Sequence, residues 1–173
     1  MSLRLWLVRH TRTNQADAGR FNGWEDVPLN EHGLIDASAL DLPHRHWAGI
    51  WSSDLVRASQ TARLAGFNPI LDPRLRELDF GSLEGLTWEE LDGATQTLLV
   101  GFDDFAAPGG ESVANFRARI RSFVTDLTLG DHLIFTHGGV IRLLLRAAGR
   151  SEHVPPGHRA EIEVAVGSKF WGD

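Results

Sequence analysis

The sequence predicts an α/β fold of three layers, with a mostly parallel central sheet and helices on both of its faces. Short apolar runs that indicate strands alternate along the chain with segments of helical periodicity, and this order is typical of βαβ units. The first run, residues 3–8, is almost continuously apolar, as expected of a strand that is buried on both faces. Neither an internal repeat nor a long linker divides the chain.

The first helix after this strand is predicted at residues 31–40, because Pro43 follows and cannot continue a helix. Residues 49–52 form the next short strand. Ser53 and Asp54 are good N-cap residues, so we expect a helix that follows them and extends to about residue 65, with a glycine directly behind it.

The clearest amphipathic helix is predicted at residues 112–127, after another short strand at residues 69–71. Its apolar residues recur at helical spacing, while Arg117, Arg119 and Arg121 take other faces. The apolar positions are Val113, Phe116, Ile120, Phe123, Val124 and Leu127.

The C-terminal third is predicted as a strand at residues 132–136, a tight turn at residues 137–139 and an apolar helix at residues 140–148. Two closing strands, which can pair as a hairpin, follow at residues 161–166 and 168–171.

Residues 80–110 lack periodicity and are predicted to be irregular and loop-rich. We expect this segment to be a small cap or lid that covers a site, within one domain that spans residues 1–173.

Composition narrows the class of protein. A net charge of −6 and a pI near 5.7 argue against nucleic acid and against an anionic membrane as partners. The absence of cysteine excludes disulfides, thiolate nucleophiles and cysteine-based zinc sites. The N-terminal run does not have the pattern of a signal peptide, and no stretch approaches the roughly 20 apolar residues of a membrane helix. We therefore expect a cytoplasmic protein.

Two histidines follow predicted strands, at the edge of the sheet where open α/β folds bind ligands. His10 follows the first strand, and His137 precedes Gly138 at a helix start, where free N–H groups and the helix dipole favour an anion. Arg9 and Arg57 bring cations to the same edge, and Glu77 ends a short extended segment. Taken one at a time, each of these residues also fits a purely structural role. The joint pattern indicates an anion-handling site.

These residues resemble the histidine phosphatase superfamily, in its phosphoglycerate mutase-like branch. The hallmark of that family is Arg-His-Gly after the first strand, which V-R-H-T-R-T matches with one change. Five further blocks occur in the expected order: R-F-N-G-W-E-D-V-P-L-N-E-H-G (20–33), S-S-D-L-V-R-A-S-Q-T-A (52–62), R-L-R-E-L-D-F-G-S-L-E-G (74–85), P-G-G-E-S (108–112) and F-T-H-G-G-V-I-R (135–142). Within the branch, the layout is most similar to that of the α-ribazole-5′-phosphate phosphatases.

The resemblance implies a phosphoglycerate mutase-like fold and a phosphoryl transfer through a phosphohistidine. His10 is the implied nucleophile. Arg9, Arg57 and His137 are expected to surround the phosphate and to stabilise its charge, helped by the N–H of Gly138.

The resemblance also assigns the remaining functional positions. Glu77 is the implied acid, which protonates the leaving alkoxide and then takes a proton from water. Asn14, Asn22 and Gly23 match or neighbour the positions that line the phosphate pocket of the family. Neither a metal nor a cofactor is implied. We expect a small phosphorylated metabolite as the partner, with neither nucleic acid nor a membrane, and leave a homodimer open.

Four positions depart from the pattern of the family. Thr11 replaces the usual glycine, and Ala16 stands where mutase-like members often place a phosphate-contacting asparagine. Phe80 and Trp88 stand where mutases carry a tyrosine and a lysine. The long arginine-bearing insertion that grips the glycerate carboxylate is also absent. A phosphatase is therefore the better prediction than a mutase.

Three functions remain open at the level of sequence. The first is a phosphatase of a small phosphorylated metabolite, with α-ribazole-5′-phosphate as the best candidate, because aromatic residues near the site can stack on a benzimidazole. The second is a cofactor-dependent phosphoglycerate mutase. The third is a phosphate-binding protein without catalysis, which Thr11 and Ala16 motivate.

Overall fold

The computed structural model of the chain describes residues 2–164 and residue 171. Its centre is a sheet of five strands in the order β3-β2-β4-β1-β5. The strands are β1 (Leu3–Arg9), β2 (Gly49–Ser52), β3 (Ile70–Leu71), β4 (Gly130–Thr136) and β5 (Arg159–Val164). β5 runs antiparallel to β1, and the other neighbouring pairs are parallel. The predicted α/β class with a mostly parallel sheet is confirmed.

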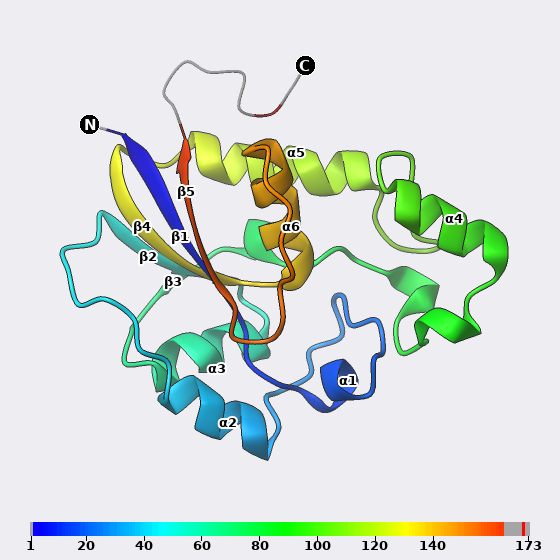
Figure 1. Cartoon of the computed structure of the whole chain (residues 1–173), viewed down its shortest axis with the longest axis horizontal. Coiled ribbons are helices and arrows are strands. Elements are labelled where there is room, and N and C mark those ends of the chain that lie inside the picture. The colour runs from blue at the N-terminus through cyan, green and yellow to red at the C-terminus, as the bar shows by residue number, and fades with distance from the viewer. Residues whose placement is uncertain (1, 165–170, 172–173) are drawn as a thin grey trace.

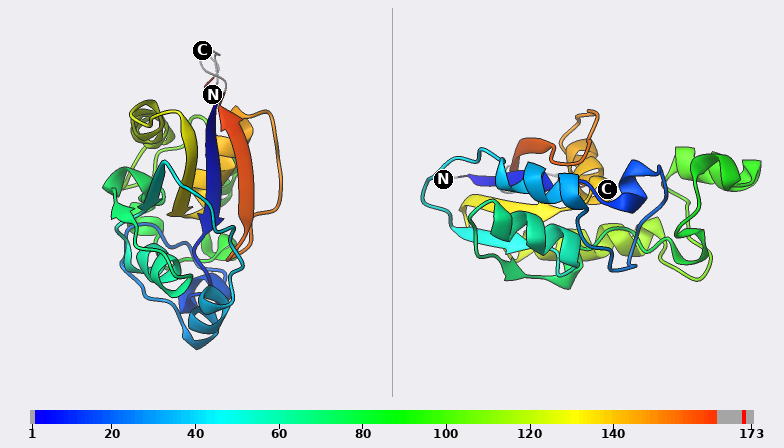
Figure 2. Two further views of the ribbon diagram at one scale, coloured as in Figure 1. Left: turned by 90° about the vertical axis from the view of Figure 1, so that its left-hand side faces the viewer. Right: turned by 90° about the horizontal axis from the view of Figure 1, so that it is seen from below.

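Helices cover both faces of this sheet, as predicted. Figures 1 and 2 show α2 and α3 together on one side of the sheet and α5 and α6 on the other. The α-helices are α1 (Asn14–Asp17), α2 (Glu31–Ser38), α3 (Val56–Leu64), α4 (Gly93–Gly101), α5 (Val113–Thr125) and α6 (Gly138–Ala147). Three 3-10 turns, η1 (Pro73–Leu75), η2 (Gly81–Leu83) and η3 (Trp88–Glu90), lie between β3 and α4.

The core explains why the first strand is apolar on both faces. Leu5 and Leu7 of β1 pack in a large cluster with the buried side chains of α5 and α6. Val8, on the opposite face, packs in a second cluster with Phe135 of β4 and Ala62 of α3. Because alternate residues of a strand point to opposite faces, β1 contributes to both hydrophobic layers.

One helix start was predicted wrongly. α3 begins at Val56, and its N-cap is Leu55, which makes no side-chain cap, instead of Ser53 or Asp54. Ser53 instead accepts a hydrogen bond from the N–H of Leu55 at 3.3 Å in a local turn. This leaves its hydroxyl next to His137.

The segment 80–110 is not loop throughout, which corrects the prediction. It contains α4, whose N-cap Asp92 accepts a hydrogen bond from the N–H of Thr95, and which projects beyond the end of the sheet (Figure 1). The helix was missed because its sequence G-A-T-Q-T-L-L-V-G begins and ends with glycine, and none of its residues is buried. It therefore has no apolar stripe.

The other elements differ from the predictions by a few residues. Of the two predicted closing strands, the first, 161–166, corresponds to β5 at Arg159–Val164. The second, 168–171, falls outside the described residues except for Trp171. In the described part of the chain, no helix is long and apolar enough to span a bilayer.

The register of the sheet places the predicted histidines side by side. Arg9 at the end of β1 is paired with Thr136 at the end of β4. His10 and His137 are the next residues of their strands, so both leave the sheet at the same level of its carboxyl edge. Ser52 of β2 pairs with Phe135, which brings Ser53 to this edge as well.

Candidate functional site

Two buried imidazoles form the centre of the site. The ring centroids of His10 and His137 are 5.3 Å apart, and the rings are inclined by 60°. His10 Nδ1 donates to the carbonyl oxygen of Thr11 at 2.7 Å, which leaves Nε2 as the nitrogen with a free lone pair. His137 Nε2 lies 2.8 Å from the hydroxyl of Ser53, and a hydroxyl that donates there leaves the proton on Nδ1.

Arg57 is fully buried and is held by backbone carbonyls instead of carboxylates. From the second position of α3, its guanidinium donates to the carbonyl of Glu25 at 2.9 Å and to that of Gly23 at 2.6 Å. Arg9, at the end of β1, donates to the carbonyl of Val154 at 2.6 Å. In the part of the chain that the structure describes, neither cation has an ion-pair partner within 4.0 Å. Buried cations in this state favour an anionic ligand.

Unpartnered polar atoms gather at this place. Among the described residues, six have a buried side-chain nitrogen or oxygen without a hydrogen-bond partner, and four of the six belong to this site. The atoms concerned at the site are Arg9 Nε, Arg57 Nε, His137 Nδ1 and the amide group of Asn22. Buried polar groups are normally satisfied. A cluster of mostly donors therefore indicates a ligand rich in acceptor oxygens.

Burial sets the charge of each group. Burial, reinforced by the nearby Arg57 and Arg9, holds the pKa of His10 well below its usual value. Burial and Arg57 lower the pKa of His137 in the same direction. Burial also lowers the pKa of Arg9 to about 10, although Glu77 opposes the shift. At neutral pH both imidazoles are therefore neutral and both guanidinium groups keep their charge.

Glu77 reaches the site from the loop between η1 and η2. One carboxylate oxygen accepts from the N–H of Gly139 at 2.9 Å and the other accepts from the N–H of Leu78 at 2.9 Å. A Cβ on Gly139 would lie 2.1 Å from this carboxylate, so only glycine permits the contact. The carboxyl group is thereby fixed at the N-terminus of α6, beside the turn that follows His137.

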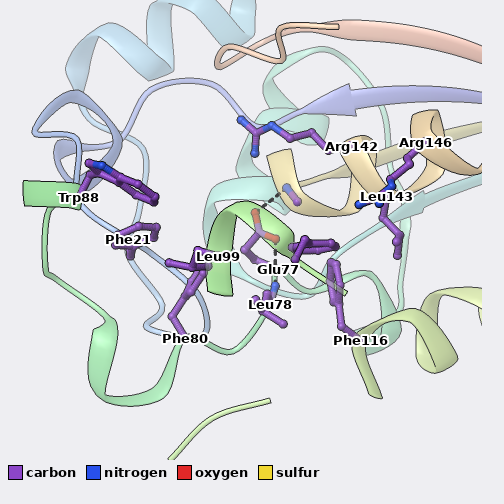
Figure 3. Close-up of a pocket in the computed structure, with 12 residues that line it drawn as sticks. Phe21, Glu77, Leu78, Phe80, Trp88, Leu99, Phe116, Arg142, Leu143 and Arg146 are labelled. Carbon is purple, nitrogen blue, oxygen red and sulfur yellow. Dashed lines mark hydrogen bonds between the residues drawn. The ribbon is translucent and has the colours of Figure 1, made fainter. Parts of the chain in front are cut away.

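A cavity of about 550 Å³ adjoins the Glu77 carboxylate (Figure 3). Most of its wall is apolar or aromatic, and the exceptions are Glu77 and two arginines of α6. It is lined by Phe21, Glu77, Leu78, Phe80, Trp88, Leu99, Phe102, Phe116, Gly139, Arg142, Leu143 and Arg146. The cavity can hold a group that is attached to an anion in the histidine site.

Residues 5–167 match the family model described as histidine phosphatase superfamily (branch 1). The chain belongs to the histidine phosphatase superfamily.

Two relatives illustrate the names within this superfamily. A probable phosphoglycerate mutase GpmB from Enterobacter sp. (strain 638) is 38% identical over 140 residues, which cover 72% of this chain and 62% of that protein. A putative phosphoserine phosphatase 2 from Hydrogenobacter thermophilus is 31% identical over 155 residues, which cover 82% of this chain and 76% of the relative. The chain thus spans less than two thirds of the first of these proteins.

Solved structures of the superfamily share the fold. The crystal structure of TTHB049 from Thermus thermophilus has a TM-score of 0.86 at 45% identity, with 92% of this chain and 93% of that chain covered. A putative α-ribazole-5′-P phosphatase from Escherichia coli has a TM-score of 0.80 at 25% identity, with 96% and 92% covered. Membership of the superfamily, together with relatives and neighbours named as phosphatases, supports a phosphatase activity.

The structure gathers most of the predicted site residues of this histidine phosphatase. Gly138 is closely approached by two arginines, because a Cβ there would lie 3.1 Å from Arg142 Nη1 and 3.3 Å from the Arg9 guanidinium carbon. Gly23 contributes its carbonyl to Arg57, and a Cβ there would lie 2.4 Å from the carbonyl oxygen of Leu78. Asn14 does not join the cluster around His10 and His137, since it is exposed at the start of α1.

Sequence reasoning missed two supporting residues, Ser53 and Arg119. Ser53 looked like a helix cap but lies against His137. Arg119 was placed only on a face other than the apolar one, with no role, yet it donates to the carbonyl of Glu77 at 2.7 Å and pairs with Glu111 at 2.7 Å. The presence of Glu111 in the P-G-G-E-S block was the signal that could have found this pair.

Thr11 is anchored on three sides. Its hydroxyl donates to the carbonyl of Gly33 at 2.7 Å, and its N–H donates to the hydroxyl of Thr61 at 3.2 Å. Its own carbonyl accepts from His10. The hydroxyl that distinguishes this chain from the Arg-His-Gly pattern therefore fastens the backbone that orients His10.

Proposed function

We propose that this chain is a metal-independent phosphatase that hydrolyses a small phosphorylated metabolite through a phosphohistidine intermediate. The observation that carries the proposal is the cluster of unpartnered nitrogens of Arg9, Arg57 and His137 around the neutral His10. Guanidinium and imidazole N–H groups suit the oxygens of a phosphate. They also supply directly the positive charge that a phosphoryl group needs during transfer.

In the first step, His10 Nε2 attacks the phosphorus and the bond between phosphorus and the leaving oxygen breaks. Glu77, in its acid form, gives its proton to that oxygen, and a neutral alcohol leaves. The charge on the three equatorial oxygens is stabilised by the cations and by the N–H of Gly138 at the start of α6.

In the second step, water attacks the phosphohistidine and the bond between nitrogen and phosphorus breaks. Glu77, now a carboxylate, accepts the proton of the water, which restores its acid form. Inorganic phosphate leaves and His10 is again neutral, ready for another turnover.

We propose α-ribazole-5′-phosphate as the first substrate to test. The rings of Phe21 and Phe80 lie 5.0 Å apart beside Trp88 on one wall of the cavity, where a flat benzimidazole can pack. The structural neighbour named for this phosphatase covers most of the chain, which agrees with the choice.

The test is a screen of phosphate esters with purified protein in EDTA. It combines measurement of inorganic phosphate with detection of an acid-labile phosphoenzyme. We expect release of phosphate from at least one small ester and a phosphoenzyme that is lost in His10→Asn. If no ester labels the wild-type protein, the chain is a phosphate-binding protein without this activity and the proposal fails.

The second candidate is a phosphoglycerate mutase, which the name of the first relative favours. Phe80 and Trp88 line the cavity without the hydroxyl and ammonium groups that the resemblance assigns to mutases at these positions. Conversion of 3-phosphoglycerate to the 2-isomer faster than phosphate release from any ester would replace the phosphatase by the mutase.

A further inference from the structure

One wall of the cavity carries two cations that a neutral flat leaving group does not use. Arg142 and Arg146 both line the cavity together with Glu77 (Figure 3). They are four residues apart on α6, so their side chains occupy the same face of the helix, about 6 Å apart along its axis. The chain as a whole is acidic, with a net charge of −6, so this positive wall is a local feature.

Arg142 lies next to the phosphate-binding turn. Its Nη1 is 3.1 Å from the position that a Cβ on Gly138 would occupy, and the Arg9 guanidinium carbon is 3.3 Å from the same point. Two guanidinium groups therefore face one glycine. Among the described residues, no carboxylate pairs with Arg142, whereas the exposed Arg12 pairs with Asp36 at 2.9 Å.

Arg146 is held only weakly. Among the described residues, Arg146 forms one ion pair, with Asp103 at 3.1 Å, and it joins side chains that are 58% and 52% exposed. Pairs of this kind contribute little to stability, so a ligand anion can take the place of Asp103. A second hollow of about 360 Å³ continues from the same two arginines to Arg150, which is already paired with Glu152 in its wall, and it leaves room for a group that extends along α6.

The ordinary alternative is that both arginines are solvated cations on an exposed helix face. That alternative explains their exposure but gives no reason for their place in the cavity of Glu77, where the leaving group of a phosphate ester must lie. A guanidinium group binds carboxylate or phosphate oxygens through two parallel hydrogen bonds. The wall is therefore matched to a second anion on the leaving group.

We propose that Arg142 and Arg146 form a subsite for a second anionic group, a carboxylate or a phosphate, on the alcohol that leaves. This inference rests on the proposed phosphatase function but narrows its substrate class. It favours esters with an anionic leaving group over α-ribazole-5′-phosphate, whose leaving group is neutral.

The experiment compares 3-phosphoglycerate with glycerol 3-phosphate, which differ in a carboxylate against a hydroxymethyl group. Release of inorganic phosphate gives kcat/KM for both. We expect the wild-type protein to prefer the carboxylate by about tenfold, the size of one charged hydrogen bond. Arg142→Gln and Arg146→Gln should each bring the ratio of the two kcat/KM values, 3-phosphoglycerate over glycerol 3-phosphate, toward one. Arg142→Lys should restore part of this preference. Arg121→Gln on α5, outside the cavity, is the control that keeps the wild-type ratio.

A wild-type ratio near one, or an equal loss on both esters in Arg142→Gln, overturns the subsite. The second outcome would place Arg142 in the phosphate clamp itself. Calorimetric binding of both esters to His10→Asn separates the two proposals. If no phosphoenzyme forms in the wild-type protein, the proposed phosphatase activity fails. The subsite is still supported if His10→Asn binds 3-phosphoglycerate more tightly than glycerol 3-phosphate and the His10→Asn/Arg142→Gln protein loses this difference. Equal binding of both esters contradicts the subsite.

A third substrate, O-phosphoserine, measured against O-phosphoethanolamine, repeats the comparison with another carboxylate.

Discussion

Thr11 shows how a single residue can orient His10, the proposed nucleophile, through its own hydrogen bonds. The carbonyl of Thr11 fixes Nδ1 of His10, so the free lone pair of the ring lies on Nε2. The hydroxyl of Thr11 binds the carbonyl of Gly33 in α2, and its N–H binds Thr61 in α3. The residue thus links both helices of one layer to the orientation of the imidazole.

We predict that Thr11→Val lowers the free energy of unfolding by about 1 kcal/mol, the net value of one buried hydrogen bond. Valine keeps the shape of threonine but cannot bind Gly33. We also expect kcat to fall more than KM rises, because His10 becomes less well oriented. Urea unfolding and steady-state kinetics measure the two effects. Thr11→Ser should retain most of both, and a Thr11→Val protein with wild-type values would contradict this role.

The glycine pair after His137 has a steric meaning that its sequence did not specify. Gly138 makes room for two arginines, and Gly139 makes room for the Glu77 carboxylate. In the sequence, this pair also fits close packing of a helix on a strand. Which atoms approach a glycine depends on loops that are distant in the chain, so spacing along the sequence cannot reveal it.

We predict that Gly139→Ala displaces Glu77, since the new Cβ would lie 2.1 Å from its carboxylate oxygen. Hydrolysis of alkyl phosphates should fall by about 10²- to 10⁴-fold, the usual contribution of a general acid. Hydrolysis of p-nitrophenyl phosphate should fall less, because its leaving group needs little protonation. Gly93→Ala in α4, where nothing lies within 4 Å, is the matched control. An equal loss on both kinds of ester would remove Glu77 from the acid role.

At the scale of elements, α5 does more than fill the core. Its buried face, with Phe116 and Ile120, follows the periodicity of the sequence. A different face carries Arg119, which donates to the carbonyls of Arg74, Arg76 and Glu77. The helix thereby fixes the loop that presents Glu77, the proposed general acid.

We predict that Arg119→Met lowers the free energy of unfolding by about 3–5 kcal/mol, because it leaves Glu111 buried without its partner. The side chains of this pair are only 16% and 11% exposed. The matched control is Arg117→Met on the same helix, whose exposed pair with Asp103 should be worth at most about 1 kcal/mol. Thermal or urea unfolding of both variants measures the two losses. Equal losses of unfolding free energy would contradict the stabilising role of the Arg119–Glu111 pair.

The elements were predictable where hydrophobic pattern decides structure. Residues 49–52 were predicted as a strand with the observed bounds, and the helix at 112–127 differs from α5 only at its ends. Prediction failed for α4, which buries none of its residues, and for Ser53, whose hydroxyl lies against a histidine instead of capping a helix. The two failures have different causes: α4 has no buried face that would create a pattern, and the partner of Ser53 lies 84 residues away along the chain.

At the scale of the molecule, an acidic protein concentrates buried positive charge at one edge of its sheet. His10 and His137 are held neutral there by burial and by the arginines. His10, Arg9, His137 and Arg57 could be singled out from sequence because parallel strands deliver their ends to a common edge. Their protonation states could not, since they follow from burial and from charges that only the fold brings together.

This arrangement makes the stability of the free protein depend on pH below about 6.5, the ordinary pKa of histidine. Both imidazoles have lowered pKa values in the folded state, so the unfolded chain binds more protons as the pH falls. The stability they contribute is present above pH 6.5 and is lost as the pH falls toward the folded pKa values. With both groups acting, the free energy of unfolding should decrease by up to about 2.7 kcal/mol per pH unit. Urea unfolding in phosphate-free buffers between pH 7 and 5 measures the slope. His10→Asn removes one of the two groups and should roughly halve it, whereas an unchanged slope would show that His10 is not held neutral by the fold.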